Sequence, residues 1–225
     1  MIKKKIGAVT IGQSPRDDIL PEMLEVLGPE YEIIEAGALD GLSLAEVRLL
    51  RPDPGDYVLV TRMADGSDVM VAERLIAPLV QEKVQGLFDL GIALVILLCT
   101  GDFPAFETTG LLIRSKEVLF GMVNAVARGR KLGVLCPAES QIPLLTPYWA
   151  MIENCELEVC AVSPYDPMTA IEPSAARLKD AGVDLIVMDC MGYTFQMQEQ
   201  IRRLTGVPVI LARGIVARFI KEMLG

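Results

Sequence analysis

The sequence predicts an α/β fold of two pseudo-symmetric lobes, each a parallel sheet covered by helices. The first observation is an internal repeat: residues 87–101, LFDLGIALVILLCTG, align without a gap with residues 178–192, LKDAGVDLIVMDCMG. The second is a matching start, because residues 131–135 (KLGVL) echo residues 5–9 (KIGAV). The third is that strand-like apolar runs alternate with helical patterns in a chain that is 52% hydrophobic. One αβ arrangement is therefore used twice.

Each copy of the repeat reads as the end of a helix, a glycine cap and a buried strand. A cysteine, Cys99 or Cys190, stands at the carboxyl end of that strand, with a glycine two residues later. Ligands of open parallel sheets bind beyond the carboxyl ends of the strands. The two cysteines are therefore expected to face each other in a cleft between the lobes.

The first half is expected to contain strands at 5–11, 31–36 and 92–99 and helices at 15–27, 43–51, 73–90 and 115–127. Ser14 before Pro15 is typical of a helix N-cap, and Ser43 with Glu46 has the spacing of a capping box. Asp65-Gly66 predicts a hairpin that joins 57–63 to 68–72. Residues 100–110 are expected to form a loop.

The second half is expected to contain strands at 131–135, 157–162, 183–190 and 207–211. Its helices are expected at 141–152, within 169–181, at 195–205 and at 214–224. The first lobe is then predicted to comprise residues 1–114 plus 208–225, with a hairpin insertion near 57–72. Residues 115–207 would form the second lobe.

Composition excludes several classes of function. A formal net charge of −9 argues against a nucleic-acid surface, which needs a basic stripe. The longest apolar run, 92–99, is far shorter than the roughly 20 residues of a membrane span. The basic start at Lys3 is followed too soon by polar residues to be a signal peptide. We therefore expect a cytoplasmic protein with no membrane partner.

The sequence contains no histidine, which excludes Ser-His-Asp and Cys-His catalysis and histidine-containing zinc sites. Acid/base chemistry must come from Cys, Asp, Glu, Lys or Tyr, and we expect no metal and no cofactor. The five cysteines form no CxxC pair, and an odd number does not suggest a disulfide framework.

Cys99 and Cys190 are the candidate catalytic residues. Backbone N–H groups after a strand can lower the pKa of a thiol below its ordinary value of about 8.5 and make it a usable base. Two such groups on opposite faces of one carbon would permit proton removal on one side and return on the other. The alternative is that both are small buried side chains inherited from a duplicated packing unit. Cys136, Cys155 and Cys160 are interpreted as packing residues.

Candidate substrate-binding residues follow the strand ends. Gln13, Ser14 and Arg16 could clamp a carboxylate or could belong to a helix N-terminus with a solvated arginine. Gly101 and Gly192 would let a carboxylate approach the backbone. The predicted set is completed by Thr100 and Met191. Arg62 and Arg213 are weaker clamp candidates, each interpreted as a surface charge.

Over its whole length the chain resembles the aspartate/glutamate racemase superfamily, which includes hydantoin racemases, maleate isomerases and arylmalonate decarboxylases. The resemblance rests on the segments KIGAVTIG, LVILLCTG, KLGVLCP, GVDLIVMDCMGY and GVPVILARG. Within that superfamily the chain is most similar to the AroM family, through TIGQSPRDD, the Asp-Gly hairpin and MDCMGY.

The resemblance implies two Rossmann-like lobes with the site in the cleft between them, where Cys99 and Cys190 match the paired bases of the racemases. Those enzymes commonly carry Cys-Asn-Thr and Cys-Thr-His, whereas this chain has Cys99-Thr100-Gly101 and Cys190-Met191-Gly192. The leading hypothesis is a cofactor-independent racemase or isomerase acting on a small carboxylate, an amino acid or dicarboxylate. The alternatives are a non-catalytic binding or regulatory protein for a small anionic metabolite, and a one-cysteine decarboxylase or isomerase. The superfamily also suggests a homo-oligomer.

Overall fold

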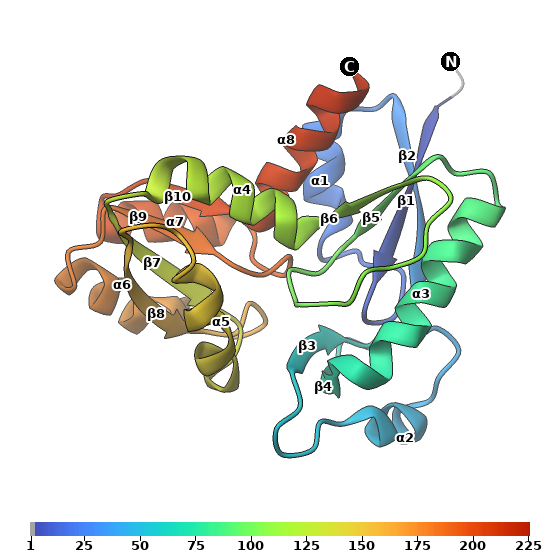
Figure 1. The fold of residues 1–225 in the computed structure, drawn as a ribbon, viewed down its shortest axis with the longest axis horizontal. Helices are drawn as coiled ribbons and strands as arrows, with labels where there is room; N and C mark the ends of the chain where they lie inside the picture. Colours follow the sequence, from blue (N-terminus) through green and yellow to red (C-terminus); the bar gives the residue numbers. More distant parts are fainter. Residues whose placement is uncertain (1–2) are drawn as a thin grey trace. The chain divides into compact units, whose positions relative to one another are not determined.

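The computed structural model describes residues 3–225 and divides into two compact units on either side of the Lys116–Glu117 bond. Residues 1 and 2, which the sequence assigned to the first lobe, lie outside the described residues. Each unit is an α/β layer structure with a four-stranded parallel sheet (Figure 1). The predicted fold class is confirmed.

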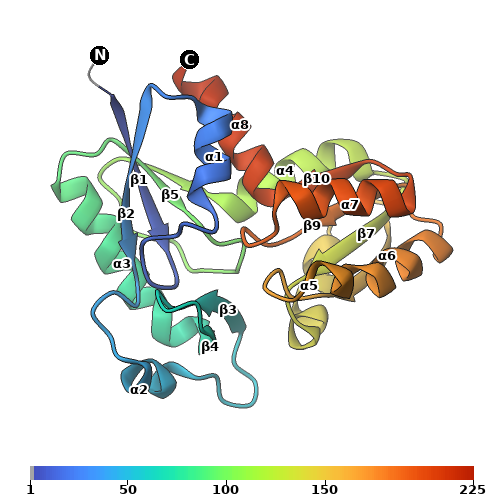
Figure 2. The ribbon, with the colours of Figure 1, turned by 180° about the vertical axis from the view of Figure 1, so that it is seen from behind.

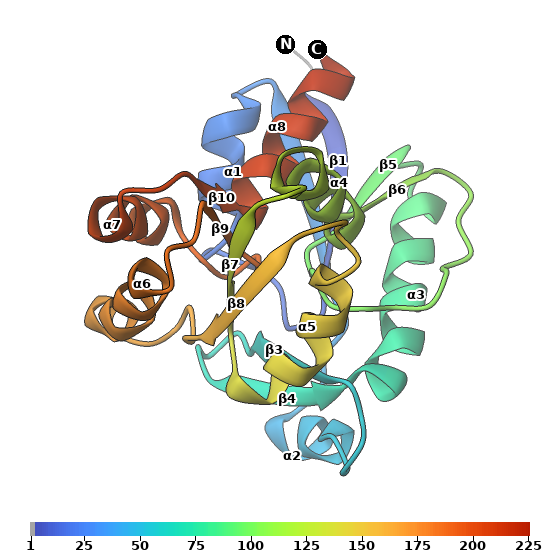
Figure 3. The same ribbon diagram turned by 60° about the vertical axis from the view of Figure 1, so that its left-hand side comes forward.

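The sheet of the first unit has the strand order β2-β1-β5-β6, with every neighbouring pair parallel. Its strands are β1 (Lys4–Thr10), β2 (Tyr31–Gly37), β5 (Leu94–Leu97) and β6 (Leu111–Arg114). Helices α1 (Leu20–Leu27) and α3 (Glu73–Asp89) lie on opposite sides of this sheet (Figure 3). Residues of α3 such as Val80 and Val84 bury their side chains against Val9 and Val95 of the strands.

A two-stranded insertion lies beyond the carboxyl ends of β1 and β2 (Figures 1 and 2). It consists of the antiparallel strands β3 (Val58–Arg62) and β4 (Asp68–Ala72), preceded by α2 (Leu44–Val47) and a 3-10 turn at Arg48–Leu50. The predicted hairpin is confirmed. The predicted capping box is confirmed too, because Ser43 accepts the N–H of Glu46 while the Glu46 carboxylate accepts the N–H of Ser43.

The sheet of the second unit has the order β10-β9-β7-β8 and is also parallel. Its strands are β7 (Lys131–Cys136), β8 (Glu156–Ala161), β9 (Leu185–Met188) and β10 (Val209–Leu211). Helices α6 (Ile171–Asp180) and α7 (Phe195–Thr205) pack side by side on one face, and α5 (Ile142–Trp149) lies on the other (Figure 3). The remaining helices are α4 (Ser115–Ala127), at the boundary, and α8 (Ala212–Leu224).

The two sheets have the same topology once the repeat is used to match them. β1, β2, β5 and β6 correspond in pairing order to β7, β8, β9 and β10. A side chain on Gly7 would meet Val95 at 2.9 Å, Leu87 at 3.0 Å and Ile92 at 3.4 Å. A side chain on Gly133 would meet Leu178 at 3.0 Å, Ile186 at 3.1 Å and Val183 at 3.4 Å. Each neighbour of Gly7 has a counterpart 91 residues later among the neighbours of Gly133, and 91 residues is the offset of the sequence repeat. The duplication therefore extends to side-chain packing.

Three of the differences between the prediction and the structure concern whole elements or their placement. Helix α1 begins at Leu20 rather than at Pro15, because Ser14 and Arg16 are held in a loop by side chains of other segments. Residues 111–114 form the strand β6, which was not predicted. The expected assignment of residues 208–225 to the first lobe is also corrected, since β10 pairs with β9 in the second sheet.

Among residues 3–225, no helix is both long enough and apolar enough to cross a bilayer. The longest, α3, has polar side chains on its exposed face and Pro78 within it.

Candidate functional site

Cys99 lies two residues beyond β5, in a loop that folds back on its own sulfur. The backbone N–H of Gly101 donates to Cys99 Sγ at 3.3 Å. The thiol is half-buried, whereas the side chain of Thr100 is buried with 7% of its surface exposed. The thiol therefore lies just beyond the carboxyl end of β5, and the N–H of Gly101 donates a hydrogen bond to it.

Cys190 has the same local geometry in the second unit. It lies two residues beyond β9, and the N–H of Gly192 donates to its Sγ, again at 3.3 Å. This thiol is half-buried as well, while the side chain of Met191 is buried. The duplication has preserved the N–H···S contact although Thr100 has been exchanged for Met191.

A donor at this position favours the charged form of a thiol. A hydrogen bond to a thiolate is stronger than one to a neutral thiol, so the contact stabilises the anion and assists its use as a base. The two predicted catalytic residues thus share one local geometry, and their acid/base role stays a prediction.

Gly101 and Gly192 are needed for steric reasons. A Cβ at Gly101 would overlap the side chain of Leu59 on β3, which is buried, and would lie 3.2 Å from Cys99 Sγ. A Cβ at Gly192 would meet the ring of Pro164 at 2.8 Å. The loop after each cysteine therefore packs closely against a neighbouring segment. This packing fixes the direction of the N–H of Gly101 and of Gly192.

Arg213 corrects one interpretation of the sequence. It was assigned a surface charge, but its side chain is fully buried in the first turn of α8. Its Nε donates to the carbonyl of Met191 and its Nη2 to the carbonyl of Gly192, both at 2.9 Å. Arg213 thereby holds the peptide units that follow Cys190. No local sequence signal identifies it, since one arginine at the start of a helix resembles any other.

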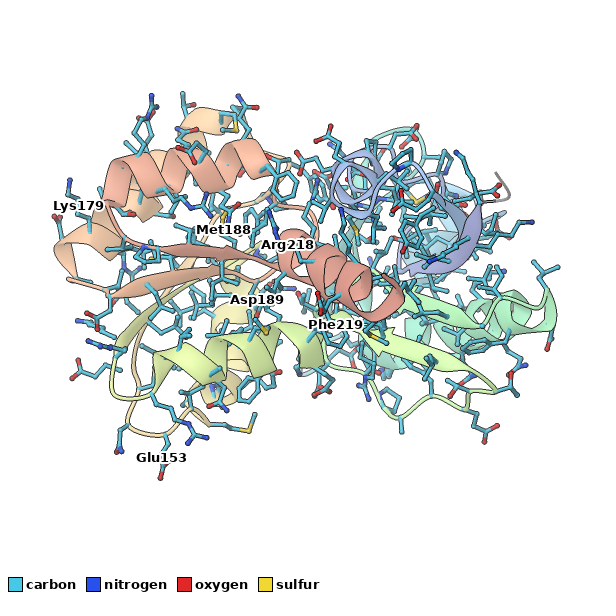
Figure 4. All side chains as sticks on the ribbon, turned by 90° about the horizontal axis from the view of Figure 1, so that it is seen from above. Glu153, Lys179, Met188, Asp189, Arg218 and Phe219 are labelled. Atoms are coloured by element: carbon cyan, nitrogen blue, oxygen red, sulfur yellow. The ribbon has the colours of Figure 1, made fainter. Side chains whose placement is uncertain are left out.

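Asp189 directly precedes Cys190 and points away from the solvent. It follows Met188 at the end of β9 (Figure 4), and its carboxylate accepts the indole N–H of Trp149 at 2.9 Å. Both side chains are buried. The backbone N–H of Asp189 continues the sheet by donating to Leu135 at 2.8 Å. This pair anchors the strand end from which the Cys190 loop departs.

Gln13 and Ser14 follow β1, and their side chains bind the protein itself. Gln13 donates to the carbonyls of Leu39 and Leu42 and accepts the N–H of Ala64. Ser14 donates through its hydroxyl and its N–H to the carboxylate of Asp40, each at 2.7 Å. These contacts connect the β1 loop to the segment after β2 and to the hairpin. A contact with substrate stays a prediction for both residues.

Arg16 is buried and not solvated, with 4% of its surface exposed. Its guanidinium donates twice to Asp18, both times at 2.8 Å, and once to the hydroxyl of Thr10. Its backbone N–H donates to Glu35 at 2.6 Å. Partial burial is the main reason that the pKa of Glu35 is raised, and this hydrogen bond opposes the effect. The substrate-clamp role of Arg16 likewise stays a prediction.

The other three cysteines have thiols that are harder to ionise. Burial raises the pKa of Cys136 to about 12, so this thiol is neutral at physiological pH. Burial also raises the pKa values of Cys155 and Cys160. Their interpretation as packing residues is consistent with these shifts.

Within the described part of the chain, no group of three or more His, Cys, Asp or Glu side chains is arranged to hold a metal ion.

The chain matches the family model described as AroM protein over residues 6–224. No curated protein matches it. Several solved structures have a similar fold. Allantoin racemase from Klebsiella pneumoniae is 18% identical, with a TM-score of 0.67 and an alignment that covers 98% of this chain and 87% of that one.

Two further solved structures have a similar fold. Maleate isomerase Iso from Pseudomonas putida S16 is 12% identical, with a TM-score of 0.65 over 98% of this chain and 92% of its own. Picrophilus torridus aspartate racemase is 11% identical, with a TM-score of 0.65 over 98% and 94%. At these identities the comparison establishes the fold.

Proposed function

Because the chain belongs to the AroM family and has the fold of racemases and isomerases, we propose that it is a cofactor-independent enzyme of this kind acting on a small carboxylate. The substrate would be an amino acid or a dicarboxylate, and Cys99 and Cys190 would be the acid/base pair. One observation carries the proposal. Both sulfurs lie at equivalent strand ends, and each accepts an N–H at 3.3 Å from the glycine two residues later.

The two proton transfers need only the two thiols. One thiolate removes the proton from the carbon beside the carboxylate, and the opposite thiol donates its proton to the other face of that carbon. The electron pair left by the first proton resides on the carboxylate oxygens until the second proton arrives. Backbone N–H groups beside Gly101 and Gly192 would bind those oxygens. The thiol and thiolate have then exchanged states, and solvent restores them.

Hydrogen exchange with the solvent tests this proposal directly. The protein is incubated in D₂O with a panel of amino acids and dicarboxylic acids, and deuterium at the carbon beside the carboxylate is measured by NMR. We expect incorporation for at least one acid, and its loss in both Cys99→Ser and Cys190→Ser. Cys155→Ser is the matched control, because this half-buried thiol lies outside the repeat.

The outcomes separate the alternatives. Loss of exchange in only one variant would indicate a one-cysteine enzyme, and activity that survives both substitutions would refute cysteine chemistry. Binding of an acid without exchange would indicate a non-catalytic protein. A crystal structure adds an independent check, since two bases that serve one carbon require sulfurs about 7–9 Å apart.

A further inference from the structure

A cavity of about 780 Å³ in the first unit begins directly after the Cys99 loop, at Asp102 and Phe103. It is bounded by the approach to β3 at Tyr57, by the first turns of α3, and by residues 102–106 between β5 and β6. Among residues 3–225, its lining includes neither Cys99 nor Cys190. Its size is within the range of pockets that bind small molecules.

Aromatic and aliphatic groups form most of its wall. Tyr57, Phe103 and Phe106 contribute three rings, and the last two pack with centroids 5.7 Å apart at an angle of 38°. Ala77 and Pro78 of α3 complete the apolar surface. Such a wall suits an apolar body of the size of one ring or a branched alkyl group.

Two of the charged groups at the cavity are already paired within the protein. The guanidinium of Arg74 donates to Asp56 at 2.7 Å and to Asp53 at 3.0 Å. The carboxylate of Asp102 forms an ion pair with Lys116, whose Nζ lies 2.6 Å from Asp102 Oδ1. The charges of Arg74 and Asp102 are therefore already balanced by side chains of the protein.

Glu73 is different. Its carboxylate lines the cavity, and among residues 3–225 it forms no ion pair and accepts no hydrogen bond. Partial burial, with the neighbouring Asp102 as a smaller cause, raises its pKa. A cation would relieve both effects, whereas an anion would add to the repulsion.

The position of Glu73 at the start of α3 also disfavours an anionic ligand. Helix N-termini attract anions through unpaired N–H groups and the helix dipole. Here the N–H of Glu73 donates to the carbonyl of Tyr57 at 2.9 Å, and the glutamate supplies the negative charge itself.

We propose that this cavity binds a small organic ammonium, with its charged group on Glu73 and an aromatic or branched apolar body against Phe103 and Phe106. A carboxylate in a cavity lined by aromatic rings can recognise such a cation through an ion pair, while the rings contact its apolar body. The site goes beyond the proposed reaction and does not depend on it.

The test uses benzylamine, titrated calorimetrically into the full-length protein. Benzyl alcohol supplies the same ring without the charge, benzoate supplies the opposite charge, and methylamine supplies the charge without the body. We expect benzylamine to bind more tightly than any of the three. Glu73→Gln should weaken it by about tenfold or more, the value of one charged hydrogen bond.

Glu82→Gln is the matched control, because Glu82 is an exposed residue of the same helix outside the cavity and should leave binding unchanged. Glu73→Asp, which keeps the charge, should retain part of the affinity and shows that a loss in Glu73→Gln is not a folding defect. The Cys99→Ser, Cys190→Ser double variant should bind benzylamine as the wild type does.

Three results would overturn the proposal. These are benzoate binding as tightly as benzylamine, equal benzylamine affinity in wild type and Glu73→Gln, or no benzylamine binding at millimolar concentration. Loss of benzylamine binding in the double cysteine variant would refute the independence of this cavity from the cysteine loops. Failure of the deuterium experiment would leave the cavity proposal intact.

Discussion

Each cysteine depends on a glycine two residues later that no other residue can replace without a shift. Gly101 carries the N–H donated to Cys99 and lies against Leu59, while Gly192 carries the N–H donated to Cys190 and lies against Pro164. The sequence singled out both glycines for the approach of a carboxylate. The structure adds a second reason, which is that the cysteine loop packs closely on another segment.

Gly101→Ala should lower the free energy of unfolding by about 1–3 kcal/mol, because the new methyl group overlaps Leu59. It should also slow alkylation of Cys99 by iodoacetamide, since the N–H···S contact is displaced. Leu59→Ala alone should cost about 2–5 kcal/mol as a cavity mutation. The double variant should cost less than the sum of the two in urea unfolding. Strict additivity would contradict the packing described for Gly101.

Arg213 positions Met191 and Gly192 through their carbonyls, so its loss should affect Cys190 and leave Cys99 unchanged. Arg213→Met keeps the length of the side chain and removes the donors, which should destabilise the protein by about 1–3 kcal/mol. Alkylation of Cys190, followed by mass spectrometry of the modified peptide, should be slower than in the wild type. Arg218→Met on the same helix is the control. Equal rates for Cys190 in all three proteins would refute the positioning role.

At the scale of elements, the duplicated sheets depend on a glycine in each first strand. A Cβ added to Gly7 would lie 3.0 Å from Leu87 of α3, and a Cβ added to Gly133 would lie 3.0 Å from Leu178 of α6. A larger residue would push α3 or α6 away from its sheet. The identical pattern in both units explains why KIGAV and KLGVL are alike when most of the intervening sequence has diverged.

Gly7→Ala and Gly133→Ala should therefore each lower the free energy of unfolding by about 1–3 kcal/mol. Gly86→Ala in α3 and Gly121→Ala in α4 are matched controls, because a side chain there meets nothing within 4 Å. These two should be neutral or stabilising by about 0.5–1 kcal/mol. Denaturant unfolding of the four variants measures the contrast, and destabilisation of all four alike would remove the packing argument.

The elements that the sequence predicted well are those with strong local signals. α4 and α7 have the predicted bounds, and the hairpin was located by Asp65-Gly66. β6 was missed because four residues, LLIR, have no usable period and become a strand only by pairing with β5. α1 begins late because Asp40 and Glu35, from distant positions, hold Ser14 and Arg16 outside the helix.

At the scale of the whole molecule, the five thiols should fall into three classes of reactivity. Cys136 and Cys160 are buried with raised pKa values, Cys155 is half-buried with a raised pKa, and Cys99 and Cys190 are half-buried with an N–H donor at the sulfur. The thiolate is the species that reacts, so exposure and ionisation act together.

Alkylation of the native protein near pH 8 should therefore modify Cys99 and Cys190 first, then Cys155, with Cys136 and Cys160 protected. In strong denaturant all five should react at similar rates. Raising the pH should accelerate Cys155 but leave Cys136 protected, because its pKa is about 12. Peptide mass spectrometry after timed quenching measures the order. Native Cys136 reacting as fast as Cys190 would contradict the model of local activation.

The sequence alone determined the duplication, the class of each half and the two candidate thiols, because these are recorded in residues that lie close together along the chain. The lack of histidine excluded histidine-based catalysis, and this too follows from the sequence alone. Only the tertiary structure decided that β10 joins the second sheet, that Arg213 is buried on the Cys190 loop, and that Gln13, Ser14 and Arg16 bind the protein itself. Apart from the pairing of Arg16 with Asp18, each of these is a contact between segments distant in sequence, so the residues around one partner do not identify the other.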